Sequence, residues 1–346
     1  MKPVAVLLAL TLLVGGWFIR PRHPSLEAGR SGDPRLQQFI DDKFDIPGHR
    51  LSIAVVTKDE VRYAGRGADE RDGFEVGSIS KALAGLLLAD AVRRGEVTLD
   101  QQVGTLLPLG DSDIADATLE QLATHSSGLP NTSHKPSAAL RSYFANLRAA
   151  NPYPFSIDDL LDQARAASTR HRGTSKYSNL GGALLGQALA RKAGKPYAEL
   201  LQERVLTPYG MTGAHIPTRK QDAAPDGYGS GGRKQEPWFG EGYAPAGAVV
   251  AGAEDLAHLA QKLLAGQGAQ ALAPRKQFDD EDRIGLFWFT SALPGTDRTM
   301  TWHNGGTGGY RSFIGLDLER GRAVVMLSDV AANVDDIATE LLGSDA

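Results

Sequence analysis

Three short stretches of this chain contain the residue types that serine acyl-transfer chemistry requires. They are Ser78-Ile79-Ser80-Lys81, Tyr177-Ser178-Asn179 and His303-Asn304-Gly305. A serine hydroxyl becomes a good nucleophile only when a nearby base removes its proton, and lysine, tyrosine or histidine can take part in that transfer. Each stretch alone is short enough to occur by chance. The interpretation therefore depends on the structural elements that would bring the three stretches together.

The first stretch is predicted to open a helix that spans Ser78 to Arg94. Residues Ala82 to Ala89 are apolar on every side, as in a buried helix, and Gly95 follows as a C-terminal stop. Ser78 and Lys81 would then share one face, one turn apart. Burial would keep the Lys81 amine neutral and able to act as a base. The alternative is that Ser78 only caps the helix and Lys81 is a solvated charge.

The second stretch is predicted to lie in a loop, because a polar segment precedes it and a helix over Leu180 to Ala193 follows. In a loop, Tyr177 can reach a cleft and serve as a second acid or base. Asn179 can hold a substrate amide through its donor and its acceptor. The alternative is that Tyr177 packs on the surface and Asn179 is a helix N-cap.

The third stretch joins two predicted strands, Thr299 to His303 and Tyr310 to Leu318. Glycines in a strand are typical of a place that another backbone or a ligand approaches closely, which suits a substrate lying along the strand. Of the eight histidines, His303 is the candidate for function. The alternative is a glycine-rich hairpin corner with an incidental histidine.

The order Ser-x-x-Lys, Tyr-x-Asn and His-x-Gly resembles the penicillin-binding protein and β-lactamase superfamily. Within it, the chain is most similar to the class C branch, which includes β-lactamases, D-Ala-D-Ala carboxypeptidases, D-aminopeptidases and esterases. Residues 118–130 and 244–256 also resemble segments of that family. The resemblance implies an α/β (α+β) fold, in which an antiparallel sheet flanked by helices meets a mainly helical region and the active site lies between them.

The resemblance also implies a role for each motif residue. Ser78 would be the acylated nucleophile, Lys81 would help to deprotonate it, and Tyr177 would shuttle the proton. The backbone N–H groups of Ser78 and Gly306 would form the oxyanion hole. The substrate-binding residues would be Asn179, His303, Asn304, Gly305 and Gly306. No metal and no cofactor is implied.

His303 stands where β-lactamases and carboxypeptidases have a lysine that faces the substrate carboxylate, and Asn304 replaces a threonine. An imidazole is mostly neutral at pH 7, so its attraction for a carboxylate is lost. The two replacements make an esterase, amidase or D-amino-acid peptidase at least as suitable as a β-lactamase. We also expect activity on carboxylate-bearing substrates to increase as His303 becomes protonated, provided that Lys81 remains neutral enough to act as the base.

The periodicity of the remaining sequence predicts where the sheet and the helices lie. A hairpin at 51–57 and 61–64 is expected to share one antiparallel sheet with strands at 284–290, 299–303, 310–318 and 323–328. Further helices are expected at 118–125, 156–167, 254–264 and 333–342. The catalytic domain would span 35–346, with the sheet drawn from 50–66 and 283–329 and the helical region from about 78–265. Segments 131–155 and 218–246 would form the rim that selects the substrate.

Residues 1–22 are predicted to be a signal peptide or an N-terminal membrane anchor. Lys2 precedes an apolar run from Pro3 to Ile19, and arginines follow at 20 and 22. The flanking residues favour the anchor. Residues 23–34 would be a linker. We expect an extracytoplasmic protein of the cell envelope, anchored or secreted, because the related proteins act on cell-wall peptides and antibiotics.

Composition excludes several other classes of protein. The net charge of −4 and the absence of a basic aromatic patch argue against a nucleic-acid partner, and the lack of cysteine excludes disulfides and thiolate metal sites. Residues 227–232 match G-x-G-x-x-G but lack the preceding strand and following helix of a dinucleotide site. No G-x-S-x-G elbow and no H-E-x-x-H motif occurs.

The sequence therefore favours a serine hydrolase that forms an acyl-enzyme at Ser78. Its expected substrates would be β-lactams, D-amino-acid peptides or esters. Its partner would thus be a small molecule or a cell-wall peptide. A penicillin-binding sensor or interaction module that acylates without turnover is the main alternative. An inactive scaffold is a third. The complete motif set favours the enzyme.

Overall fold

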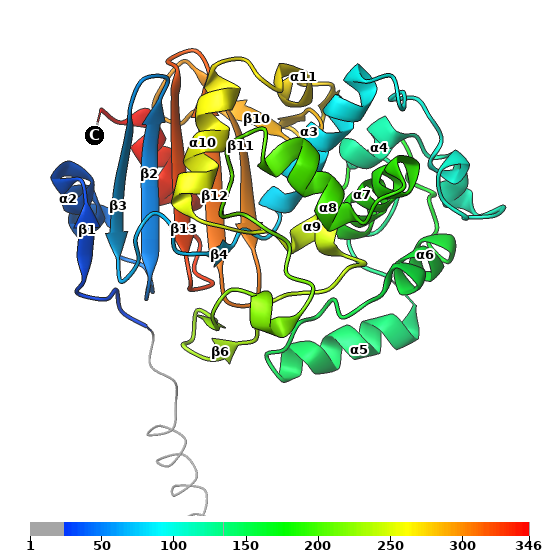
Figure 1. Cartoon of the computed structure of the whole chain (residues 1–346), viewed down its shortest axis with the longest axis horizontal. Helices are drawn as coiled ribbons and strands as arrows, with labels where there is room; N and C mark the ends of the chain where they lie inside the picture. The colour runs from blue at the N-terminus through cyan, green and yellow to red at the C-terminus, as the bar shows by residue number, and fades with distance from the viewer. Residues whose placement is uncertain (1–23, 134, 346) are drawn as a thin grey trace, which may run out of the picture.

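A single antiparallel sheet organises the fold of residues 24–345, which the computed structural model describes with the exception of residue 134. Its strand order is β1-β3-β2-β13-β12-β11-β10-β9-β8, so N-terminal and C-terminal strands share it, as predicted (Figure 1). The strands are β1 (Arg30–Gly32), β2 (Leu51–Thr57), β3 (Val61–Arg66), β8 (Lys276–Gln277), β9 (Arg283–Ile284), β10 (Phe289–Ala292), β11 (Thr299–Gly306), β12 (Arg311–Asp317) and β13 (Arg322–Ser328).

Helices cover both faces of this sheet (Figure 1). On one face lie α2 (Pro34–Lys43) and α12 (Asp335–Gly343), and on the other lies α10 (Ala253–Leu264) next to the helical region. The helical region comprises α3 (Ile79–Arg93), α4 (Leu119–Ala123), α5 (Pro136–Leu147), α6 (Ile157–Arg165), α7 (Asn179–Ala193), α8 (Tyr197–Leu201), α9 (Ala244–Gly247) and α11 (Ala269–Leu272). The predicted fold class, an antiparallel sheet flanked by helices plus a mainly helical region, is confirmed.

Alternation along the strands divides the apolar side chains between two cores. In β2, Ile53 and Val55 contribute to the core beneath α2 and α12, whereas Ala54 and Val56 contribute to the core shared with the helical region. Successive strand residues point to opposite faces, so a strand covered on both sides is apolar throughout. All of β2 except Thr57 is buried.

The buried helix α3 connects the sheet to the helical region. Twelve of its fifteen residues are buried, which agrees with the apolar sequence. At Gly85, a Cβ atom would lie 2.0 Å from the carbonyl oxygen of Leu286. Glycine at this position therefore lets α3 approach the segment between β9 and β10 closely.

That segment differs from the sequence prediction, which placed one strand over Ile284 to Thr290. The chain bends between β9 and β10, and Phe287 has a φ of 63°. The N–H groups of Leu286 and Phe287 donate to carbonyls of Ala271 and Ala123 instead of to a strand. The run is apolar because it is buried against helices, which sequence periodicity does not distinguish from a strand.

Two other segments are also more ordered than predicted. Residues 30–32, assigned to a linker, form β1 and pair with β3 through Ser31 and Gly65. Residues 136–147, assigned to a rim loop, form α5. Both depend on contacts that a local pattern does not contain.

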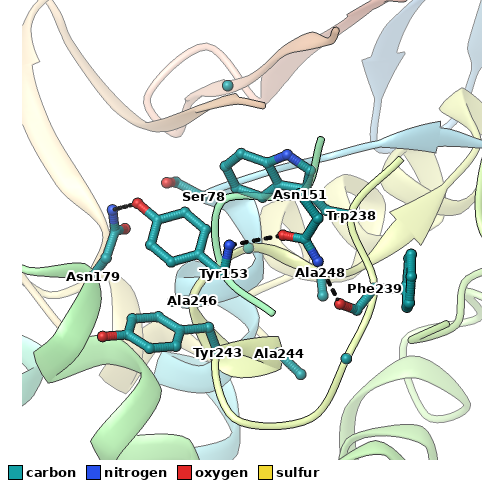
Figure 2. A pocket seen from close by; sticks show the side chains of 13 residues that line it. Ser78, Asn151, Tyr153, Asn179, Trp238, Phe239, Tyr243, Ala244, Ala246 and Ala248 are labelled. Atoms are coloured by element: carbon teal, nitrogen blue, oxygen red, sulfur yellow. Dashed lines mark hydrogen bonds between the residues drawn. The ribbon is translucent and has the colours of Figure 1, made fainter. Parts of the chain in front are cut away.

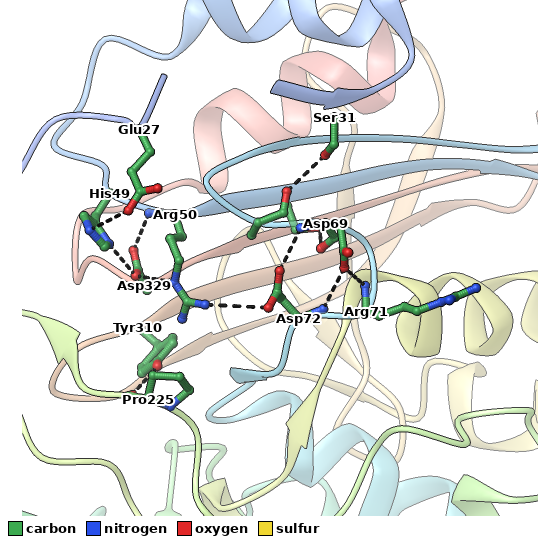
Figure 3. A network of polar contacts seen from close by, with 12 residues as sticks. Glu27, Ser31, His49, Arg50, Asp69, Arg71, Asp72, Pro225, Tyr310 and Asp329 are labelled. Carbon is green, nitrogen blue, oxygen red and sulfur yellow. Dashed lines mark hydrogen bonds and ion pairs between the residues drawn. The ribbon is translucent and has the colours of Figure 1, made fainter. Parts of the chain in front are cut away.

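The buried residue Asp329 links the second rim segment to the end of the sheet (Figure 3). Asp329 follows β13 and accepts hydrogen bonds from His49 Nδ1 at 2.8 Å and from the Arg50 N–H at 2.7 Å. Its carbonyl accepts from the N–H of Tyr228, which lies in the short hairpin of β5 (Gly227–Tyr228) and β6 (Lys234–Gln235). The hydroxyl of Tyr310 donates to the carbonyl of Pro225 in the same segment.

Residues 1–22, predicted to be a signal peptide or anchor, lie outside the described residues. Across 24–345, none of the helices combines the length and the apolar character needed to span a bilayer. In the same part of the chain, histidine and acidic side chains form no group of three or more that could hold a metal ion.

Candidate active site

Ser78 stands at the start of α3 with its hydroxyl free of any capping role. Its backbone is helical, with φ −67° and ψ −9°, and its side chain makes no cap hydrogen bond. The hydroxyl instead lies 3.0 Å from Nζ of Lys81, one turn along the helix. This arrangement argues against the alternative of a simple helix cap. A small antiparallel pair, β4 (Phe74–Glu75) and β7 (Val250–Ala251), leads the chain into the helix.

Lys81 is completely buried. Its ammonium group donates to the carbonyl oxygen of Ala246 at 2.6 Å. A Cβ atom on Gly182 of α7 would lie 3.1 Å from three carbons of the lysine stem, so glycine there leaves room for the side chain. Burial lowers the pKa of Lys81 to about 7. A substantial fraction of the amine is therefore neutral at pH 7 and able to accept a proton from Ser78.

Tyr177 approaches the same hydroxyl from the loop before α7. Its side chain is hydrogen-bonded to Ser78, and Nζ of Lys81 lies 5.0 Å from the centre of its ring. Burial raises the pKa of the Tyr177 hydroxyl above its ordinary value, although the hydrogen bond with Ser78 opposes this. Tyr177 is therefore protonated at neutral pH and suited to donate or relay a proton.

His125 positions the loop that carries Tyr177, a role that the sequence did not reveal. The two rings lie 4.5 Å apart between centroids, and Nδ1 of His125 accepts a hydrogen bond from the N–H of Ser178 at 3.2 Å. Burial, followed by the charge of Lys81, lowers the pKa of His125 well below its usual range. A neutral imidazole keeps the acceptor that this hydrogen bond needs. With a φ of 55° just after α4, His125 adopts a backbone that is uncommon outside glycine.

A cavity of about 140 Å³ opens beside Ser78 (Figure 2). Asn179 is the first residue of α7, and its Nδ2 donates to the hydroxyl of Tyr153 at 3.2 Å. The N-cap of this helix is Ser178, not Asn179. Asn151 donates to the carbonyl of Phe239 at 2.7 Å, which joins the two rim segments. The lining residues, all uncharged, are Ser78, Asn151, Tyr153, Asn179, Trp238, Phe239, Gly240, Tyr243, Ala244, Ala246, Gly247, Ala248 and Gly306.

The aromatic lining comes from the two segments that the sequence assigned to a substrate-selecting rim. Tyr153 stacks on Tyr243 with ring centroids 4.9 Å apart, and Trp238 meets the Tyr153 ring edge-on at 5.1 Å. The individual residues were not predicted, because nothing in a local pattern specifies which loop side chains turn inward. These rings make one wall of the cavity apolar (Figure 2).

The two side chains of the third motif, those of His303 and Asn304, do not take the positions that the sequence predicted. His303 is completely buried and does not line the cavity; its Nδ1–H donates to the carbonyl of Asn304 at 2.6 Å. Burial, followed by the charge of Lys81, lowers the pKa of His303 to about 3. The side chain of Asn304 points to the opposite face of β11 and donates to Asp335 at 2.6 Å. Neither side chain is therefore placed to bind a substrate carboxylate in the cavity.

The glycines of the third motif bring two backbones together at the serine. A Cβ atom on Gly305 would lie 2.0 Å from the carbonyl oxygen of Val76. Gly77 has a φ of 50°, and its Cβ would lie 2.6 Å from the nitrogen of Gly306. Ser78 and Gly306 thus face the same cavity with adjacent backbones, as two oxyanion-hole donors must.

Glu75 is a buried carboxyl that the sequence did not single out. It accepts the N–H of Trp238 and a side-chain hydrogen bond from Thr307. It therefore connects the aromatic wall to the strand end that follows Gly306. Burial raises the pKa of Glu75 to about 7, although both hydrogen bonds oppose the shift.

We expect kcat/KM to increase with pH through an apparent pKa near 7. The Lys81 amine must be neutral to accept the serine proton, and its pKa is about 7. A pH series of kcat/KM with a neutral ester checks this. Because the pKa of Glu75 is also about 7, the series is repeated with Glu75→Gln. If kcat/KM still increases with pH in that variant, the group that titrates is Lys81. If the increase disappears, the assignment to Lys81 is wrong.

Comparisons with known proteins identify the family of this chain. The family described as Beta-lactamase matches residues 36–343. A protein named Beta-lactamase from Providencia stuartii is 26% identical over 212 residues, covering 56% of this chain and 50% of its own length. Esterase EstB from Burkholderia gladioli is 28% identical over 156 residues, covering 43% of this chain and 40% of its own length. The chain thus matches about half or less of these relatives' length.

The fold is also found among solved structures. The crystal structure of D-alanine carboxypeptidase AmpC from Burkholderia cenocepacia superposes with a TM-score of 0.70 at 21% identity, covering 89% of this chain and 96% of that one. At this identity the likeness concerns the fold. The family match extends over most of the chain and includes all three motifs, so this chain belongs to the Beta-lactamase family.

Proposed function

We propose that this protein is a serine hydrolase that forms an acyl-enzyme at Ser78 and acts in the cell envelope. The observation that carries the proposal is the contact between Ser78 Oγ, which faces the cavity, and Nζ of the completely buried Lys81, 3.0 Å apart. A buried lysine is costly to a fold unless it is neutral, and a neutral amine beside a serine is a base. The proposed cell-envelope location rests on the apolar N-terminal sequence and on the cell-wall and antibiotic substrates of the family that the chain resembles.

In the proposed reaction, Oγ of Ser78 attacks the substrate carbonyl carbon while its proton moves to Nζ of Lys81. The N–H groups of Ser78 and Gly306 stabilise the oxyanion, each such donor being worth about 100- to 1000-fold in rate. Tyr177 delivers a proton to the leaving group as the carbon–heteroatom bond breaks. Water then gives a proton to the pair formed by Lys81 and Tyr177 and attacks the acyl carbon. The bond between this carbon and Ser78 Oγ breaks, and the pair returns a proton to Oγ, which regenerates the hydroxyl.

The cavity favours an uncharged substrate with an apolar or aromatic acyl group. All of its described lining residues are uncharged, and Tyr153, Trp238 and Tyr243 form an aromatic wall. Asn179 is placed to bind an amide or ester carbonyl near Ser78. The neutral, buried His303 supplies no cation for a carboxylate. We therefore infer that esters and uncharged peptides are better substrates than β-lactams, and the match to an esterase is in keeping with this.

The same placement revises the expected pH response of carboxylate-bearing substrates. With a pKa of about 3, His303 remains neutral throughout the range in which the Lys81 amine can act as a base. Protonation of His303 is therefore not expected to increase activity on such substrates between pH 5 and pH 8, roughly the range in which an unperturbed histidine would titrate.

The substrate preference is tested by replacing Trp238, which forms part of the aromatic wall. We expect Trp238→Ala to lower kcat/KM for p-nitrophenyl phenylacetate about tenfold relative to p-nitrophenyl acetate, because an aromatic contact worth about 1.5 kcal/mol is lost. Steady-state kinetics with both esters give the ratio. Tyr143→Ala is the matched control, since Tyr143 is an aromatic residue exposed on α5 outside the cavity.

An unchanged ester ratio in Trp238→Ala would show that the aromatic wall does not hold the acyl group. Wild-type protein that turns over a penicillin faster than either ester would overturn the preference for uncharged substrates. It would leave the acyl-enzyme proposal intact, because the same serine would carry both reactions.

A further inference from the structure

The helix α5 carries its large apolar side chains on the outside of the molecule. Leu140, Tyr143, Phe144 and Leu147 are between 45% and 58% exposed, and they are four of the six large apolar residues that the described chain exposes. Only Ala138 of this helix is buried. The i, i+3, i+4, i+7 spacing places the four on one stripe. Most helices in water are stabilised by burying such a stripe against another surface. The stripe of α5 is exposed instead, which is typical of a surface that binds another molecule.

The surroundings of this stripe differ in charge between its two ends. Near the N-terminal half, Lys135 and Arg141 lie 3.8 Å and 3.9 Å from acidic residues of α6. At the C-terminal end, Arg148, Arg233 and Lys234 are exposed, and within the described residues they form no ion pair. Nη2 of Arg233 donates to the carbonyl of Leu147 at 2.8 Å, which holds its charge at the helix end.

The position of α5 relative to the start of the described chain indicates what could cover the stripe. In Figure 1, the coloured chain begins at the lower edge of the molecule, and α5 lies along that same edge. The 23 residues that precede it in the sequence contain the apolar run from Pro3 to Ile19, flanked by Lys2, Arg20 and Arg22. A run of this length suits insertion into a bilayer. A membrane that received it would lie on the α5 side of the protein.

We propose that α5 docks onto the surface of an anionic lipid bilayer. The stripe of Leu140, Tyr143, Phe144 and Leu147 enters the boundary between headgroups and acyl chains, as amphipathic interfacial helices do. The cationic cluster of Arg148, Arg233 and Lys234 contacts lipid phosphates, and the attraction weakens with added salt.

Docking in this way also orients the candidate active site. A groove beside α5 is lined by Phe144 and Arg148 and shares Asn151 and Phe239 with the cavity at Ser78. The cavity therefore opens close to the docked helix. Substrates that partition into or lie on the bilayer would reach Ser78 without crossing the bulk solvent.

The absence of cysteine from the chain allows a direct test. Leu147→Cys in the full chain is labelled with a nitroxide and mixed with vesicles of phosphatidylcholine and phosphatidylglycerol. Electron paramagnetic resonance then compares collisions with oxygen, which concentrates in lipid, and with a water-soluble nickel chelate. We expect the oxygen-to-nickel collision ratio at residue 147 to increase several-fold on adding vesicles. Leu318→Cys is the matched control, an exposed leucine in the turn between β12 and β13.

Insertion of the N-terminal segment would hold the chain on vesicles whatever α5 does, so the readout is the label depth at residue 147, which reports docking of α5 itself. Adding Arg148→Glu, or using phosphatidylcholine alone, should reduce the ratio at residue 147. A label at 147 that stays as water-accessible as the label at 318 overturns the proposal. A label shielded from both reagents without vesicles also overturns it. In that case, shielding that depends on protein concentration would show that a second copy of the chain covers the stripe. Shielding that does not depend on concentration would show that residues 1–23 cover it.

Discussion

Ser78→Ala abolishes covalent labelling by acyl donors and lowers kcat/KM for an ester by about 10³- to 10⁶-fold. The nucleophilic oxygen is gone, while the oxyanion donors and the cavity remain, so a residual rate above the uncatalysed one is expected. Intact-mass spectrometry of the full chain, incubated in parallel with a p-nitrophenyl ester and with a penicillin, measures the adduct. Release of p-nitrophenol measures turnover in the same samples.

Ser80→Ala is the matched control, since Ser80 lies in the same motif but its hydroxyl accepts the N–H of Val249 and does not contact Lys81 in the structure. That variant should still form the adduct. An adduct that forms on Ser78→Ala and disappears from Ser80→Ala would reassign the nucleophile. A long-lived adduct without turnover would identify a penicillin-binding sensor. Wild-type protein that forms no adduct and releases no product would leave two explanations, a substrate that neither reagent resembles or an inactive scaffold.

The parts of the site that could be predicted from sequence are those whose geometry is local. Ser78 and Lys81 belong to one helix, so their spacing of three residues already determines that they meet. Tyr177 and Asn179 were assigned to a loop at a helix start, and the structure places them at the N-terminus of α7. Helices and strands with clear periodicity, such as α7 and β13, were predicted to within two residues of their bounds.

The parts that could not be predicted depend on contacts between distant segments. His303 and Asn304 are neighbours in a strand and must point to opposite faces, but only the packing of α3 and α12 decides which face belongs to the site. His125 and Glu75 act on loops that are about 50 and 160 residues away along the chain. α5 was missed because its apolar stripe is bounded by turn-forming residues on both sides and covers no core.

Lys81→Met should remove most of the activity and make the protein more stable at neutral pH. The activity falls because no other base contacts the Ser78 hydroxyl in the described structure except the protonated Tyr177, and a general base contributes about 10²- to 10⁴-fold. Methionine fills nearly the same volume without a polar group. Single-turnover acylation followed by mass spectrometry measures the loss of base catalysis directly.

The gain in stability follows from the direction of the Lys81 pKa shift. Burial lowers this pKa from 10.5 to about 7 in the folded protein. Between these two values, the unfolded chain binds a proton that the folded protein does not, so wild-type stability rises with pH. Below about pH 7 the full penalty of burying the charged lysine applies, on the order of 5 kcal/mol. The variant also loses two hydrogen bonds worth about 1 kcal/mol each, which offsets part of its gain in stability.

Urea unfolding of the full chain at about pH 6, 8 and 10 measures this dependence. The excess stability of Lys81→Met over the wild type should be largest at the lowest pH. It should shrink toward zero or below as the pH approaches 10.5, the pKa of this lysine in the unfolded chain. Lys192→Met is the matched control, because Lys192 is exposed on α7 and should show no such trend. If the stability of Lys81→Met relative to the wild type does not fall as the pH rises, the folded protein does not lower the pKa of residue 81. Lys81 could not then be the base at neutral pH, and Tyr177 would have to remove the Ser78 proton.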